Sequence, residues 1–157
     1  MTVILSIDPS SNKATKSNTG IVLLENGKLL DHWCLPFGVK GFRNWHEKEF
    51  GEIKCDKVIF EHFEARDNSK AKDNTVLETI AEIQRLIPRA EPFRNGGYKS
   101  DVPDELLKAL GLWKFGKSHH ADVRAAARLA IFYAMRNDLE DFVTGVGELL
   151  NEAIQGS

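Results

Sequence analysis

The 157-residue chain contains only two cysteines, Cys34 and Cys55. Two thiols are too few for a disulfide scaffold or a cysteine-based zinc site, so we expect both to be reduced and buried. No stretch approaches the roughly 20 apolar residues that a membrane-spanning helix needs. The first residues lack a basic leader and reach an acid at Asp8, which favours a strand over a signal peptide. These absences predict a cytoplasmic protein, and the length predicts one domain over residues 1–157.

The formal net charge of −2 conceals an uneven distribution. Residues 137–157 hold five acidic residues and no Lys or Arg, so this segment carries −5 and the rest of the chain +3. Residues 9–20 and 108–117 contain lysines and no acid. Such a separation permits a basic face that binds phosphate groups, although a charged run is more commonly solvated surface.

Short apolar runs and helical spacings predict a mixed α/β fold. Asn26-Gly27 is typical of a tight hairpin, Pro88 ends one helix, Pro103 lies in the first turn of another, and Ser118 caps a third. The predicted strands cover residues 3–7, 21–24, 29–35, 57–60 and 91–94, and the predicted helices cover 41–53, 75–87, 101–110, 119–136 and 142–153. This order predicts a five-stranded mixed sheet flanked by helices, with its first three strands antiparallel.

Three acidic residues occupy positions where side chains from several elements can meet. Asp8 ends the first buried strand, Glu61 ends the fourth, and Asp122 lies in the first turn of a late helix. Carboxylates gathered together repel one another unless a cation neutralises them, and oxygen ligands suit Mg²⁺ or Mn²⁺. His119 precedes Asp122 by three residues, so it shares that face of the helix. Each residue alone is also compatible with an ordinary turn or surface position, and Glu64 competes with Glu61.

The ordered set resembles the RuvC-type Holliday junction resolvases of the ribonuclease H-like superfamily, the short phage-type members above all. The matching segments are Ile4 to Ser10 with Thr19 to Val22, Val58 to Phe63, and Ser118 to Ala126. The resemblance implies a ribonuclease H-like fold and a structure-specific endodeoxyribonuclease that cleaves branched DNA. It also implies two metal ions per site, held by Asp8, Glu61, Asp122 and His119, with His119 either a ligand or a proton carrier. The loop after Asp8 is longer than the family's usual turn, and Val123 replaces an alanine.

The same resemblance implies a homodimer, because two symmetric cuts need two active sites, and a host-cell location if the chain is phage-encoded. Helix 75–87 is a possible interface, although an apolar helical stripe is by default core. Phe63, Trp113 and Phe115 are candidates for stacking on unpaired bases, with a buried position the commoner alternative. The basic residues expected to bind DNA are Lys13, Lys16, Arg66, Lys70, Lys72, Arg94, Lys99, Lys114 and Lys117.

Other functions fit parts of this pattern. A ribonuclease H-like enzyme acting on RNA–DNA hybrids or flaps would share the acidic site. A protein that binds branched DNA without cutting it, or a purely structural α/β domain, would not need all four site residues. The segment from Asp8 to Gly20 is also similar to the phosphate loop of actin-like ATPases, but 157 residues are too few for the two lobes those proteins need.

Overall fold

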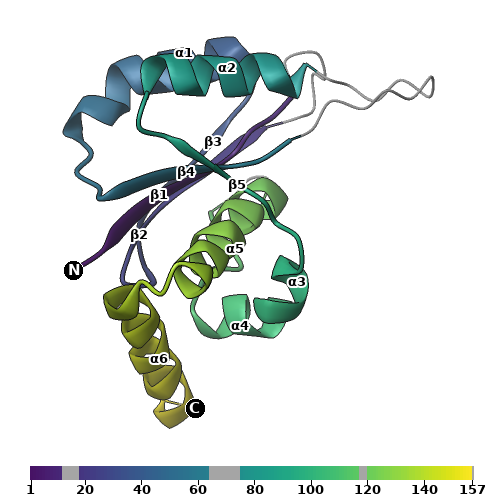
Figure 1. The fold of residues 1–157 in the computed structure, drawn as a ribbon. Helices are drawn as coiled ribbons and strands as arrows, with labels where there is room; N and C mark the ends of the chain where they lie inside the picture. The colour runs from purple at the N-terminus through teal and green to yellow at the C-terminus, as the bar shows by residue number, and fades with distance from the viewer. Residues whose placement is uncertain (12–17, 64–74, 117–119, 157) are drawn as a thin grey trace.

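Five strands form one sheet in the order β3-β2-β1-β4-β5 (Figure 1). The computed structural model describes residues 1–11, 18–63, 75–116 and 120–156. β1 pairs with β2 antiparallel and with β4 parallel, β2 pairs with β3 antiparallel, and β4 pairs with β5 parallel. The predicted mixed sheet with three antiparallel strands is therefore confirmed. The strands are β1 (Val3–Asp8), β2 (Thr19–Glu25), β3 (Lys28–Leu35), β4 (Lys57–Glu61) and β5 (Glu91–Phe93).

Alternate residues of the central strands enter two separate hydrophobic cores. Leu5 and Ile7 of β1 pack under α1 (Gly38–Glu49) and α2 (Val76–Leu86), with the 3₁₀ turn Phe50–Glu52 after α1. Ile4 packs on the opposite face, which α5 (His120–Arg136) covers. Figure 1 shows the resulting layers, with α1 and α2 on one side of the sheet and the remaining helices on the other. Both faces of the sheet are thus covered, as its continuous apolar strands require.

The predicted helix over residues 101–110 is wrong at its start. The structure has two short helices there, α3 (Tyr98–Asp101) and α4 (Asp104–Ala109). Pro103 caps the second helix with an extended backbone (φ −72°, ψ 166°) and does not lie inside its first turn. A proline disfavours helical geometry in the residue before it, so Val102 ends α3 instead of continuing it.

The two C-terminal helices follow the predicted pattern. The four residues expected on the inner face of α5, namely Val123, Ala126, Ala130 and Tyr133, are all buried. In α6 (Glu140–Gln155), Phe142 and Val146 are buried, whereas Ala153 is exposed. Ser118, the expected cap of α5, lies outside the described residues. Within the described ranges, no helix combines the length and apolarity that crossing a bilayer requires.

The structure also tests two smaller predictions, about helix 75–87 and about the two cysteines. Helix 75–87 is observed as α2, and its buried residues Val76, Ile80 and Ile83 place its apolar stripe in the core. Cys34 and Cys55 are free thiols, but both are only partly buried, so the expectation of full burial is wrong. Cys34 is the second-last residue of β3, and Cys55 lies two residues before β4 begins.

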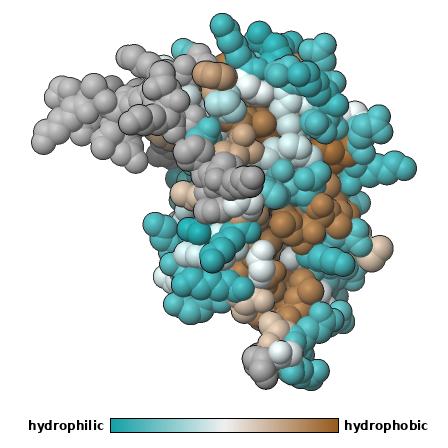
Figure 2. Space-filling model, turned by 180° about the vertical axis from the view of Figure 1, so that it is seen from behind, coloured by the Kyte–Doolittle hydropathy of each residue, from teal (hydrophilic) through white to brown (hydrophobic). Residues whose placement is uncertain are grey.

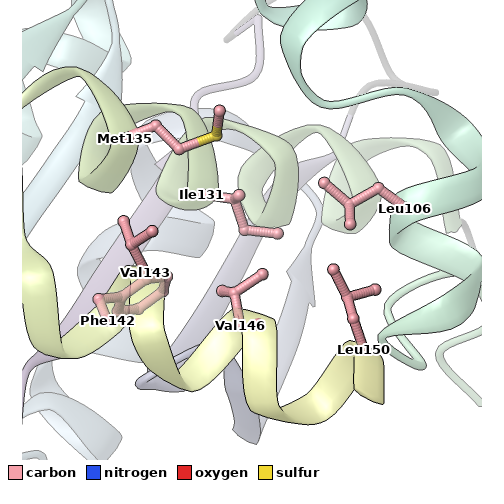
Figure 3. Close-up of a pocket in the computed structure, with 8 residues that line it drawn as sticks. Leu106, Ile131, Met135, Phe142, Val143, Val146 and Leu150 are labelled. Carbon is pink, nitrogen blue, oxygen red and sulfur yellow. The ribbon is translucent and has the colours of Figure 1, made fainter. Parts of the chain in front are cut away.

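An apolar groove of about 250 Å³ lies between α4, α5 and α6. Leu106, Ile131, Val146 and Leu150 line its walls, and Met135 and Val143 lie at one end (Figure 3). Figure 2 shows apolar surface between hydrophilic surfaces on this half of the molecule. The groove offers no carboxylate or cationic side chain, so it is unsuited to metal or phosphate chemistry.

Candidate active site

Asp8 and Glu61 lie side by side because their strands are parallel neighbours. Ile7 of β1 aligns with Phe60 of β4, so the next residue of each strand is an acid at the same edge of the sheet. A hydrogen bond joins the two carboxyl groups. The structure therefore brings these two predicted site residues close together.

Asp122 reaches the same edge through a close contact between α5 and β2. Gly20 aligns with Asp8 in the antiparallel β1–β2 pair. A β carbon built on Gly20 would lie 2.3 Å from the carbonyl carbon of Asp122 and 2.7 Å from the amide nitrogen of Val123. Only glycine permits this approach, since any larger side chain would push the first turn of α5 away.

The segment that leaves β1 is tied to the start of β2. The amide of Ser10 donates to the hydroxyl oxygen of Thr19 at 3.1 Å, and the two hydroxyls lie 2.8 Å apart. Both residues are buried. This contact fixes the backbone just after Asp8 and just before Gly20, so it holds the edge at which the acids meet.

The three carboxylates form a strongly negative site. The pKa of Asp8 is raised well above its ordinary value, first by burial, then by the hydrogen bond with Glu61, and then by the charges of Glu61 and Asp122. A partly buried carboxylate beside two others is costly unless a cation compensates it. The donors are all carboxylate oxygens, the ligand type that Mg²⁺ and Mn²⁺ prefer. The site therefore fits a hard divalent cation in both its charge and its ligand chemistry.

The side chains do not form a closed ligand shell. Among the described residues, no group of three His, Cys, Asp or Glu side chains is arranged as a ready metal centre. Glu61 instead receives a hydrogen bond from the side-chain amide of Asn95. His119 and Glu64, the other predicted site residues, lie outside the described residues.

Asn95 and Tyr98 belong to this site although their roles were not predicted from the sequence. Asn95 follows β5, which pairs with the end of β4 through Glu61 and Phe93. The pKa of Tyr98 is raised, first by burial and then by the charges of Glu61 and Asp8, so its hydroxyl lies within the electrostatic reach of the acids. Asn95-Gly96-Gly97 has the composition of an ordinary turn, and only its place beside the end of a strand hints at more.

A thiol completes the edge of the site next to Asp122. Cys34 of β3 aligns with Gly20, which in turn aligns with Asp8. Burial raises the pKa of the Cys34 thiol, and the charge of Asp122 raises it further. Cys34 is therefore a neutral neighbour of the acidic site and adds no negative charge to it.

The residues predicted to bind DNA divide into two groups. Arg94, Lys99 and Lys114 are described, and all three are exposed. Among the aromatic residues, Phe115 is buried in the core, and Phe63 and Trp113 are partly buried. The remaining predicted cations, Lys13, Lys16, Arg66, Lys70, Lys72 and Lys117, lie outside the described residues.

Comparison with solved structures identifies the fold of this chain. Neither a protein-family model nor a curated protein matches the sequence. RuvC from Thermus thermophilus in complex with a Holliday junction substrate matches with a TM-score of 0.68 over 90% of this chain and 98% of that chain, at 11% identity. A second Thermus thermophilus RuvC structure matches with a TM-score of 0.61 over 87% and 96% of the two chains, at 12% identity. The chain has the RuvC fold.

The match confirms the fold that the sequence motifs implied. Both RuvC chains are covered almost completely, so the similarity includes the whole arrangement of sheet and helices and not one local motif. At this level of identity the shared property is the fold itself, because one fold hosts many activities. Function must be argued from Asp8, Glu61 and Asp122 and from the surface around them.

Proposed function

We propose that this protein is a metal-dependent endodeoxyribonuclease that cleaves branched DNA, Holliday junctions and related branches included. The observation that carries the proposal is the meeting of Asp8, Glu61 and Asp122 from β1, β4 and α5 at one edge of a RuvC fold. A structural role would not bring three carboxylates together, since their mutual repulsion destabilises the folded chain.

The proposed cofactor is a pair of Mg²⁺ or Mn²⁺ ions in each active site. When bound, two such ions supply a nucleophilic hydroxide from water and stabilise the charge that develops on the leaving oxygen of a phosphodiester. The charges of Glu61 and Asp122 both act on Asp8, so these three carboxylates together would hold the ions. His119 stays a predicted ligand or acceptor of the proton from the attacking water.

Glu61 enters this scheme in a fixed orientation. The Asn95 amide donates to one of its oxygens and leaves the rest of the carboxylate directed toward Asp8. A fixed ligand loses less conformational entropy when it binds a metal or reacting group, which favours catalysis. Asn95 is thus a positioning residue in the proposed mechanism.

The proposed substrate is branched DNA, and the proposed active assembly is a homodimer. The RuvC protein with the same fold was solved with a Holliday junction substrate. Symmetric cutting of two strands needs two copies of the site, which one chain of this size supplies only once. Light scattering after gel filtration at micromolar concentration tests the dimer, and a monomer that cleaves junctions at the full rate contradicts it.

The decisive experiment compares the wild-type protein with Asp8→Asn, a change that removes one charge at nearly constant volume. We expect Mg²⁺-dependent cleavage of a four-way junction by the wild type, loss of cleavage in the variant, and equal or tighter DNA binding by the variant. Asp31→Asn, at an exposed position of β3, is the matched control and should cleave normally.

The substrate panel decides among the alternatives. It contains a four-way junction, a flap, an RNA–DNA hybrid and a linear duplex. Preferred cleavage of the hybrid or flap would identify a different ribonuclease H-like nuclease. Junction binding with no metal-dependent cleavage would identify a binding protein. Cleavage by Asp8→Asn at the wild-type rate would exclude the proposed site.

A further inference from the structure

A basic hollow lies at the end of α4 and along the loop that follows it. It has a volume of about 600 Å³ and is lined by Lys108, Gly111, Trp113 and Lys114. Lys108 and Lys114 are exposed, and Trp113 is partly buried between them. All four lining residues belong to the segment 108–117, which contains lysines and no acidic residue.

The indole ring of Trp113 contacts two cationic side chains. The guanidinium carbon of Arg124 lies 3.7 Å from the ring centroid, and the ammonium nitrogen of Lys108 lies 4.7 Å from it. Arg124 also donates from Nε to the backbone carbonyl of Trp113. Each contact restrains a long side chain that would otherwise sample many rotamers. Two positive groups are therefore held at defined positions around one ring.

The loop that carries Trp113 is anchored at both ends. Leu112 and Phe115 are buried in the core on either side of Trp113 and Lys114. The amide of Leu112 donates to the carbonyl of Leu107 at 2.8 Å, which fixes the loop to the end of α4. Gly111 supplies the positive φ of 74° that this turn requires. The backbone that forms the hollow is therefore fixed to the hydrophobic core.

The hollow is connected to the helix that carries Asp122, because Arg124 of α5 contacts Trp113. Arg124 lies two residues after Asp122, so the two side chains leave the same turn of the helix in different directions. The backbone of Asp122 contacts β2, and its charge acts on Asp8, whereas the Arg124 guanidinium contacts the ring of Trp113. A ligand in the hollow would therefore lie across this helical turn from Asp122 and would not enter the acidic site.

We infer that Lys108, Lys114 and Arg124, arranged around Trp113, bind the phosphate backbone of the branched DNA substrate. This inference rests on the proposed function and names a contact surface for its substrate. Arg124 uses one of its five N–H groups on the Trp113 carbonyl, which leaves donors for a phosphate oxygen. The ring of Trp113 already carries Arg124, so its role here is to position cations, and the predicted stacking of Trp113 on a base is not needed.

The test measures binding of a fluorescent four-way junction by anisotropy in EDTA, over a range of salt concentrations. The variants are Lys108→Gln with Lys114→Gln, Arg124→Gln, Trp113→Leu and Trp113→Phe. Lys28→Gln, which changes an exposed lysine at the start of β3, is the matched control. Circular dichroism melting checks that each variant is folded.

We expect the double lysine variant to bind several-fold more weakly and its plot of log affinity against log salt to be shallower by about 2, since each lost phosphate contact removes about one counterion. Arg124→Gln should reduce the slope by about 1. Trp113→Leu should weaken binding and Trp113→Phe should retain most of it, because phenylalanine preserves a ring for the cations. Lys28→Gln should not change the slope.

Folded variants with wild-type affinity and slope would overturn the inference. If the wild type cleaves junctions while these variants bind normally, the inference fails and the proposed function stands. If the wild type binds DNA through these residues without cutting it, the inference stands and the proposed nuclease function fails. Binding lost equally in Lys28→Gln would show only a general charge effect and would also overturn the inference.

Discussion

Gly20 and Asp122 are in van der Waals contact through their backbones, although they are about a hundred positions apart in the chain. Their contact joins β2 to the first turn of α5. Because Gly20 aligns with Asp8 across the sheet, the same contact sets how far Asp122 lies from the other acids. A residue with no side chain thus determines the geometry of the site.

Gly20→Ala tests that relationship. Its β carbon would lie 2.3 Å from both the carbonyl carbon and oxygen of Asp122, so the start of α5 must move. We expect a loss of about 1–3 kcal/mol in the free energy of unfolding, measured by denaturant titration, together with loss of metal-dependent cleavage. Gly51→Ala is the control, because a β carbon there meets no atom within 4 Å. Equal stability of the two variants would contradict the close contact.

Asn95→Ala tests the positioning of Glu61. Without the amide, the Glu61 carboxylate loses the donor that orients it. We expect the affinity for Mn²⁺, measured by titration of free ion through electron paramagnetic resonance, to fall by about 10–100-fold, as for other residues that orient metal ligands. Asn137→Ala, which removes an amide bound to the Tyr133 carbonyl at the far end of α5, should leave Mn²⁺ binding unchanged. Unaltered Mn²⁺ affinity in Asn95→Ala would remove Asn95 from the site.

Glu82 gives a prediction about pH and stability. Its side chain is only 5% exposed and forms ion pairs with Arg43 and Arg85. The hydrogen bond from Arg85 lowers the pKa of Glu82, burial opposes that shift, and the hydrogen bond from Arg43 adds to the lowering. A lowered pKa in the folded state means that the stabilisation is complete above the unfolded value and is lost as pH falls through the folded value.

Glu82→Gln should therefore reduce the free energy of unfolding by about 1.5–3 kcal/mol at neutral pH. The difference from the wild type should narrow as the pH is lowered below the unfolded-state value near 4.5. Denaturant titrations at a series of pH values measure this. Glu47→Gln, at an exposed position of α1, should be almost neutral throughout. A difference that widens on acidification would contradict the assignment.

The positions of the three acids could be predicted from the sequence because each follows a strong local pattern. Asp8 and Glu61 end apolar runs that only a buried strand explains, and Asp122 opens a helix with a clear buried face. The order of strands and helices then limits the ways in which these ends can meet. The sheet followed from these periodic segments, whereas the expected gathering of the acids also depended on the resemblance to the RuvC-type resolvases.

The parts that could not be predicted depend on contacts between distant segments. The Asn95 side chain acquires its role only when β5 pairs with β4, and a turn sequence carries no sign of that partner. The break between α3 and α4 arises because Pro103 is the N-cap of α4. From the sequence alone, Pro103 could equally lie in the first turn of one longer helix. Arg124 and Trp113 meet across a loop whose path the sequence does not specify.

Two glycines of α6 give a paired prediction about how this helix docks. A β carbon on Gly145 would lie 2.3 Å from the carbonyl oxygen of Asn26 in the β2–β3 hairpin, whereas one on Gly147 meets no atom within 4 Å. Asn26 cannot withdraw easily, because its backbone amide and side-chain oxygen both bond to Thr2 at 3.0 Å.

Gly145→Ala should therefore lower the free energy of unfolding by about 1–3 kcal/mol, since the helix must separate from the hairpin. Gly147→Ala should raise it by about 0.5–1 kcal/mol, because alanine restricts the unfolded chain and favours the helix. Denaturant titration of both variants measures the two effects against the same wild type. Opposite signs at two positions only two residues apart require that one face of α6 rests on the hairpin, and a gain in stability for both would show that it does not.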